Sequence, residues 1–168
     1  MTSPSDAQHQ GESFVQELRW VHGMIRRDLN AVQRLAAETL EGATSVDLRA
    51  EIDSLQTDGP LWKLRMNCLH YCSFVHGHHS LEDRALFPAL LESNRKLRPV
   101  IDKLEADHRA VAVHLDEITA GVDELQQDGA PATRLRLVAA LDTLAGHLLE
   151  HLDYEEEAIS PTLRSWTR

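Results

Sequence analysis

Cysteine and long apolar runs are both scarce in this 168-residue sequence. The two cysteines, Cys68 and Cys72, lie one helical turn apart and form no C-x-x-C motif. This spacing excludes a disulfide-stapled scaffold and favours a reducing, cytoplasmic location. No apolar run approaches the roughly 20 residues that span a bilayer. Residues 1–12 are polar and acidic, unlike a signal or transit peptide, so we expect no membrane association.

Positive charge is also in short supply. The chain has 17 Lys and Arg residues against 27 Asp and Glu residues, a formal net charge of −10, and no basic cluster. Such a surface repels a phosphate backbone, so we expect no nucleic acid partner. Strand-like alternation of apolar and polar residues is absent as well, and a chain of this length suits a single domain.

Helix signals, by contrast, run through most of the sequence. A capping box from Ser13 to Gln16 predicts the start of the first helix. Each later apolar pattern of helical period opens at a proline, namely Pro60, Pro99 and Pro131. The predicted helices span residues 13–42, 60–93, 99–128 and 131–163.

The linkers decide the architecture and the domain boundaries. Short linkers make neighbouring helices antiparallel, so the sequence predicts an all-α fold, an up-down-up-down antiparallel four-helix bundle over residues 13–163. We expect residues 1–12 to form a disordered polar N-terminal tail and residues 164–168 a C-terminal tail. The longer connection, residues 43–59, contains a candidate short helix at residues 46–55.

A repeated motif carries the chemistry. His78-x3-Glu82 and His151-x3-Glu155 are each followed, in the same frame, by an acid, an alanine, a leucine or isoleucine, a proline and a leucine. The preceding predicted helices also correspond, because His22 and His108 each lie between leucines at matching distances. Each half of the chain therefore contributes one lone histidine and one His-x3-Glu pair.

The spacing predicts that these side chains point into the bundle and bind metal. Residues four apart share a helix face, and these faces carry the leucines of the core. A buried carboxylate is costly unless it is paired or bound to a cation. Imidazole and carboxylate together suit iron, manganese or zinc. The predicted ligands of two incompletely filled metal sites are His22, His78, Glu82, His108, His151 and Glu155.

Three further side chains are candidates to support the site. His79 corresponds to Leu152 in the other half and projects about 100° from His78, so we expect it to be dispensable as a ligand. His147, one turn before His151, is either a third imidazole there or a hydrogen-bonding neighbour. Tyr71 either packs in the core or hydrogen-bonds to the site.

The neighbouring polar residues are not expected to bind metal directly. Asp83, Glu156 and Glu157 are expected at the surface or as hydrogen-bond partners of the ligands. The remaining helical histidines are expected at the surface or between helices; they are His70, His76 and His114.

These motifs resemble the hemerythrin-like, HHE cation-binding family, in its bacterial type. The match covers the lone histidines, both His-x3-Glu pairs and the Leu86-Phe-Pro88-Ala-Leu90 stretch. The resemblance implies two iron ions in an oxygen-bridged, non-heme di-iron site, with Glu82 and Glu155 as bridging carboxylates. Oxygen-carrying hemerythrins have His-x3-His on the third helix, whereas here His108 is followed by Ala112, so an oxygen carrier is disfavoured.

The favoured interpretation of function is a di-iron protein that reacts with a small oxidant, either hydrogen peroxide or nitric oxide, with peroxide disproportionation first. No catalytic side chain beyond the metal ligands is required. One alternative is a non-enzymatic protein that binds or senses oxygen or iron, and another is a structural bundle or zinc protein. The sequence leaves the electron donor and the oligomeric state open.

Overall fold

The computed structural model describes residues 4–41, 60–127 and 130–166. Its elements are α1 (Pro4–Glu41), α3 (Pro60–Leu81), a π-helical turn η1 (Glu82–Leu86), α4 (Phe87–Ser93), a 3-10 turn η2 (Arg95–Leu97), α5 (Arg98–Gln127) and α6 (Pro131–Arg164). None of these described segments is a strand. The candidate helix at residues 46–55 lies outside the described residues.

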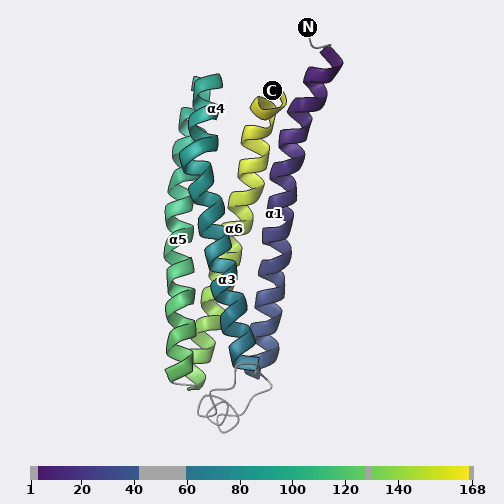
Figure 1. The fold of residues 1–168 in the computed structure, drawn as a ribbon. Helices are drawn as coiled ribbons and strands as arrows, with labels where there is room; N and C mark the ends of the chain where they lie inside the picture. The colour runs from purple at the N-terminus through teal and green to yellow at the C-terminus, as the bar shows by residue number, and fades with distance from the viewer. Residues whose placement is uncertain (1–3, 42–59, 128–129, 167–168) are drawn as a thin grey trace.

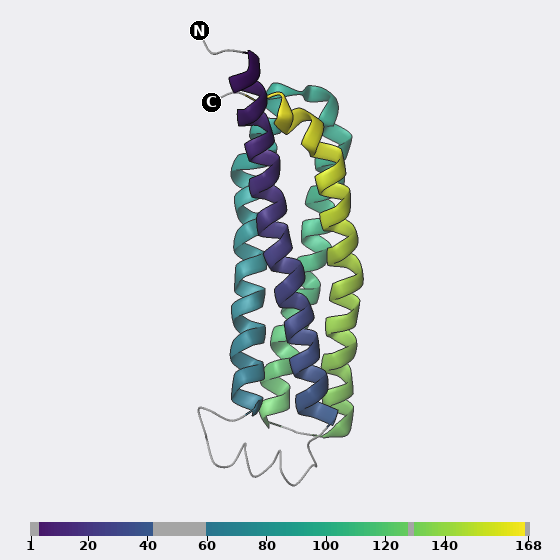
Figure 2. The ribbon, with the colours of Figure 1, turned by 90° about the vertical axis from the view of Figure 1, so that its right-hand side faces the viewer.

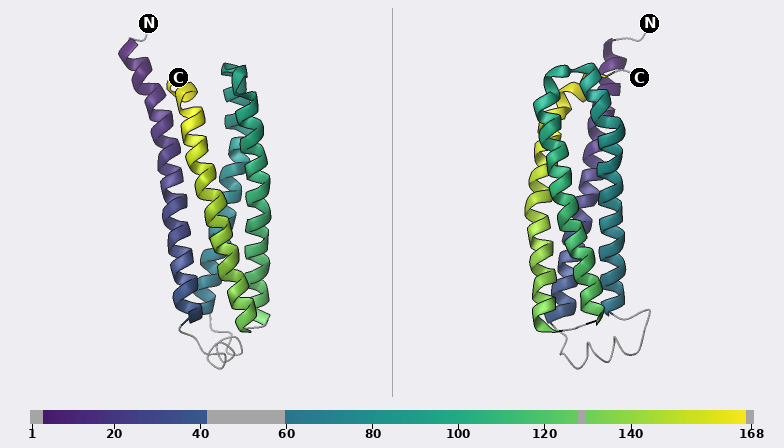
Figure 3. Two further views of the ribbon diagram at one scale, coloured as in Figure 1. Left: turned by 180° about the vertical axis from the view of Figure 1, so that it is seen from behind. Right: turned by 90° about the vertical axis from the view of Figure 1, so that its left-hand side faces the viewer.

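The helices pack as a four-helix bundle, in which α3, η1 and α4 together form one of the four rods (Figure 1). The α1 and α5 helices each contact both α3 and α6, and α4 also contacts α6. Successive rods run in alternating directions, and the start of α1, the end of α6 and α4 share one end of the bundle (Figures 1 and 2). The views in Figure 3 show the same arrangement from behind and from the side. The all-α four-helix bundle is therefore confirmed, and none of the described helices is apolar enough along its length to cross a membrane.

The first helix is longer than its capping box predicts. It begins at Pro4, so residues 4–12 continue the helix instead of forming a tail. The added segment contacts the end of α6, where Arg164 Nε donates to Glu12 Oε2 at 3.0 Å. The C-terminal residues also pack, because Trp166 meets Phe14 edge-on at 5.6 Å and donates to Ser93 Oγ at 2.9 Å.

The second predicted helix is interrupted near its end. The backbone N–H of Phe87 bonds to the carbonyl of Glu82, five residues earlier, which makes a π-helical turn. Pro88 supplies a reason, since proline lacks an N–H and its ring crowds the carbonyl four residues before it. The turn begins at Glu82 itself, so the backbone leaves α-helical geometry at a predicted metal ligand.

The core is divided into two apolar parts. One part contains the buried apolar residues of α1 from Ile25 onward, together with Val75, Val111 and Leu152. The other contains Leu18 and residues of the opposite end of the bundle, among them Phe87, Leu104 and Ile159. The predicted ligands fall between these parts along the first three rods, and on α6 they lie at the boundary, where His151 directly precedes Leu152. A polar layer therefore separates two hydrophobic ones.

Two helix glycines give a direct test of the packing of α1 on α6. A Cβ at Gly11 would clash with the backbone carbonyl of Arg164, whereas a Cβ at Gly146 would meet nothing within 4 Å. Gly11→Ala should therefore destabilise the bundle by about 1–3 kcal/mol, as overpacking does. Gly146→Ala should stabilise it by roughly 0.5–1 kcal/mol, because glycine is a poor helix former. Urea unfolding measures both, and a stabilised Gly11→Ala would contradict the close approach.

Candidate metal centre

The polar layer between the two apolar parts contains side chains from all four rods. All of them are at most 5% exposed except His78, whose side chain is 10% exposed. They are His22 of α1, His78 and His79 of α3, Glu82 of η1, His108 of α5, and His151 and Glu155 of α6. Every ligand predicted from the sequence is therefore in one layer, with His79 as an additional member.

These side chains point their free donor atoms at one another. The Nε2 atoms of the five histidines and all four carboxylate oxygens of Glu82 and Glu155 are buried without a hydrogen-bond partner. A buried, unpartnered polar atom costs about 1–3 kcal/mol. Nine such atoms in one layer fit a site built for cations, because imidazole nitrogen and carboxylate oxygen are both metal ligands.

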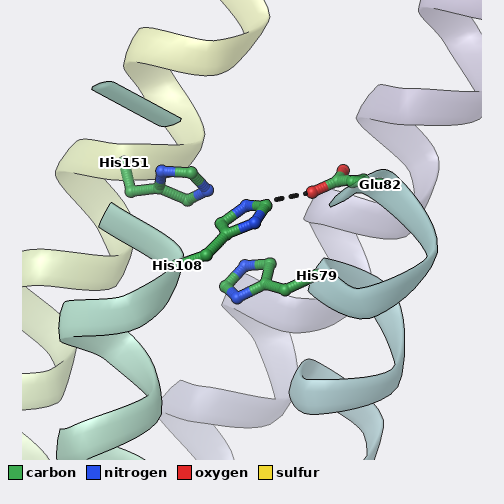
Figure 4. A group of neighbouring side chains, drawn as sticks. All are labelled: His79, Glu82, His108 and His151. Carbon is green, nitrogen blue, oxygen red and sulfur yellow. Dashed lines mark ion pairs between the residues drawn. The ribbon is translucent and has the colours of Figure 1, made fainter. Parts of the chain in front are cut away.

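The donors form two groups that share Glu82. One group, drawn in Figure 4, contains His79, Glu82, His108 and His151, and the other contains His22, His78 and Glu82; within each group the ligand atoms lie within 4.8 Å of one another. Glu82 Oε2 is 3.2 Å from His108 Nε2, while Oε1 is 2.9 Å from His78 Nε2. The two oxygens of one carboxylate therefore face different groups, as a bridging ligand requires.

Glu155 connects the same two groups from α6. Its Oε2 atom is 3.5 Å from the Nε2 atoms of both His22 and His151. Since His22 belongs to one group and His151 to the other, Glu155 is placed as a second shared carboxylate. Two shared carboxylates and five imidazoles are enough donors for two cations.

The outer ring nitrogens of three histidines have carboxylate partners. His22 Nδ1 is 2.9 Å from Glu156 Oε1, and His108 Nδ1 is 2.7 Å from Asp83 Oδ1. His151 Nδ1 is 3.3 Å from Asp107 Oδ2. A carboxylate at Nδ1 favours the proton there and leaves Nε2 free to bind a metal.

These contacts decide what Asp83 and Glu156 do. The sequence left two roles possible for each of them, a position at the surface or a hydrogen bond to a ligand. In the structure, both hydrogen-bond to a histidine of the cluster. Arg26 Nη1 in turn donates to Glu156 Oε1 at 2.8 Å, which holds that carboxylate in place. Glu157, by contrast, is exposed.

Burial sets the protonation states of the metal-free cluster. Desolvation lowers the pKa of His22 to about 2 and that of His108 to about 3, and it also lowers the pKa of His79. Desolvation raises the pKa of Glu82 to about 8, and desolvation together with the Glu82 charge raises that of Glu155. At neutral pH the imidazoles are thus neutral and at least one carboxyl carries a proton, which a cation would displace.

The expectation that His79 points away from the cluster is wrong. His79 is 5% exposed, and its ring stacks on that of His108 with centroids 3.9 Å apart and planes 9° apart. The 100° step from His78 turns His79 toward α5, and His78 meets His22 of α1 edge-on at 5.3 Å. Since the layer extends from α1 to α5, two consecutive residues of α3 both reach it.

The other two supporting candidates, His147 and Tyr71, form their hydrogen bonds outside the cluster. His147 is exposed and bonds to His114 on α5, with a ring-nitrogen separation of 3.1 Å. Tyr71 is buried in the larger apolar part and donates its hydroxyl to the Ile25 carbonyl at 3.2 Å, so core packing is its role. Of the remaining histidines, His70 and His76 are exposed, as expected.

Comparison with known families agrees with this geometry. The model of the hemerythrin HHE cation binding domain matches residues 13–163. The chain belongs to this family. The resemblance drawn from the two His-x3-Glu pairs is thereby confirmed, and the matched residues include the whole polar layer of this HHE domain. Neither the curated proteins nor the solved structures compared with it gave a match.

Proposed function

We propose that this HHE domain holds two iron ions in the polar layer and reacts with a small oxidant, hydrogen peroxide or nitric oxide. The observation that carries the proposal is the set of nine buried, unpartnered donor atoms. A pair of iron ions, when bound, would supply the reversible change of oxidation state that such chemistry needs. Imidazole and carboxylate are suitable donors for iron, and no side chain of the layer is required as a nucleophile.

The two groups contain unequal numbers of imidazoles. His22 and His78 would bind one ion, and His79, His108 and His151 the other, with both carboxylates shared. The first ion would then receive two imidazoles and the second three. The group with fewer imidazoles leaves more room for a small ligand, so we assign the oxidant to the side of His22 and His78.

The chain's own contribution is to orient the donors and keep water away. The carboxylates at the outer ring nitrogens of three histidines fix the direction of their Nε2 atoms. Phe87 stacks on His108 with centroids 5.2 Å apart, on the side of the smaller apolar part. Apolar residues on both sides of the layer lower the local polarity, which strengthens the interaction between bound cations and carboxylates.

A pair of histidine variants tests the ligand assignment. His79→Ala should lose at least one metal ion per chain, because its ring lies in the group with His108 and His151. His147→Ala should retain both cluster ions, because its ring bonds to His114 outside the layer. Metal analysis of the two purified variants gives the result. Full loading of His79→Ala would remove His79 from the ligands and restore the equal sites expected from the repeat.

Metal analysis joined to turnover assays tests the function itself. We expect two iron ions per chain, near-ultraviolet absorption of the oxidised protein, and consumption of peroxide or nitric oxide that is lost on chelation. Reversible oxygen binding without consumption of either oxidant would instead indicate an oxygen-binding or sensing protein. A colourless protein that retains zinc under the same conditions would exclude a redox role.

A further inference from the structure

A second pair of histidines lies outside the polar layer, with His147 exposed and His114 partly buried. His114 of α5 and His147 of α6 approach each other with 3.1 Å between Nε2 of the first and Nδ1 of the second. Their rings are nearly perpendicular, at 87°, with centroids 4.7 Å apart. Neither residue has a role in the cluster, yet each offers a ring nitrogen to the same point between two helices.

Glu117 gives this pair a feature of metal-binding histidines. Its Oε2 atom is 3.6 Å from Nδ1 of His114, which is one turn earlier on α5 and is buried at that nitrogen without a hydrogen-bond partner. This separation is too long for a hydrogen bond, but a negative charge on that side favours the tautomer with the proton on Nδ1, which leaves the lone pair on Nε2. The lone pair of His114 is therefore directed toward His147.

The separation of the two nitrogens suits one ion. Two imidazoles at a metal–nitrogen distance of about 2.0–2.1 Å, with a bond angle between octahedral and tetrahedral, have their nitrogens about 2.8–3.4 Å apart. The observed 3.1 Å lies in this interval. A shift of the His147 proton from Nδ1 to Nε2, with small rotations of the rings, would direct both lone pairs at a shared cation.

The pair lies beside a pocket that reaches the cluster. The pocket has a volume of about 190 Å³, and both His147 and the cluster residue His151 line it. Two carboxylates, Asp107 and Glu150, also line it, while the positive charge of Lys103 is paired with Asp107 at 2.7 Å. The lining is therefore compatible with a cation, and its two histidines belong to α6, one turn apart.

We propose that His114 and His147 bind a divalent transition metal ion at the mouth of this pocket, from which the ion enters the cluster past His151. The proposal rests on the proposed function, because capture is useful only if the cluster is loaded with metal. Two imidazoles and water ligands hold such an ion without enclosing it. An open site of this kind releases its ion more readily than a cluster with seven protein ligands.

Nickel binding to the iron-loaded protein tests the surface site. With the cluster filled, the wild type should bind one Ni²⁺ per chain in equilibrium dialysis, and both His114→Gln and His147→Gln should lose it. His70→Gln is the matched control, because His70 is an exposed helix histidine away from the pair, and it should retain the ion. Nickel binding that is the same in all four proteins would overturn the proposal.

The rate of iron loading tests the capture role. When Fe²⁺ is added at limiting concentration to metal-free protein, His114→Gln and His147→Gln should fill the cluster several-fold more slowly than wild type and His70→Gln, and reach the same final iron content. Equal loading rates would overturn the proposal even if nickel binds. A wild type that takes up no iron at all would contradict the proposed function instead, and the nickel difference between variants would still report on the surface site.

Discussion

Replacing either shared carboxylate should empty most of the metal centre. Glu82→Gln removes the one carboxylate whose two oxygens face both groups, and Glu155→Gln removes the other link between them. Loss of a residue that only orients a ligand costs about 10–100-fold in metal affinity, so loss of a shared ligand should exceed the upper end of that range. Metal titration of the purified variants measures the loss.

The same substitutions should weaken metal binding but should not destabilise the metal-free protein. Without metal, ionising both Glu82 and Glu155 in a buried layer is unfavourable, which is a reason for the raised pKa of Glu155. A glutamine in place of either residue cannot ionise, so it adds no buried charge and the chelated variant should unfold no earlier than the chelated wild type. Glu157→Gln is the matched control, because Glu157 lies on α6 but is exposed. Full metal loading in both cluster variants would exclude the bridging assignment.

Removing the metal from the wild type should lower its melting temperature strongly. Each ion present at about 1,000 times its Kd stabilises the folded state by about 4 kcal/mol. For two ions this corresponds to a shift on the order of 20 °C in a domain of this size. Calorimetry with and without a chelator measures the difference, and addition of ferrous iron should restore the higher melting temperature.

The size of the shift distinguishes a buried centre from a surface one. The metal-free layer must bury two carboxyl groups and five imidazoles between apolar parts of the core, which is unfavourable without cations. Equal melting temperatures with and without chelator would show that metal does not bind in this layer.

The features that the sequence predicted well are periodic or local. The apolar pattern opened by Pro60 and Pro131 marked helices that begin at those residues, and the duplicated His-x3-Glu pairs placed Glu82 and Glu155 in one buried layer. Both predictions depend on i to i+4 spacing along a single helix, which the sequence displays directly.

The features that the sequence did not predict depend on contacts between neighbouring helices. His79 was set aside because the repeat places Leu152 opposite it, but its burial is decided by the position of α5 beside α3. The layer spans more than one helix face, and the adjacent pair His78-His79 is the signal that could have indicated this. The start of α1 at Pro4 likewise depends on contacts with the distant Arg164.

The π-helical turn was missed for a local reason. The sequence predicts one continuous helix over residues 60–93, whereas the chain accommodates Pro88 by widening the turn that begins at Glu82. Pro161 occupies the same frame in the second half, yet α6 remains an α-helix through it. The repeat in the sequence is therefore closer than the repeat in the backbone, and we find no physical reason for that difference.

A crystal structure of the iron-loaded protein, with anomalous data collected at the iron absorption edge, tests the central claim most directly. The account predicts two anomalous peaks in the polar layer, one bonded to Nε2 of His22 and His78 and one bonded to Nε2 of His79, His108 and His151. Glu82 and Glu155 should each contact both peaks. A single peak in the layer, or peaks only at the surface of the bundle, would contradict it.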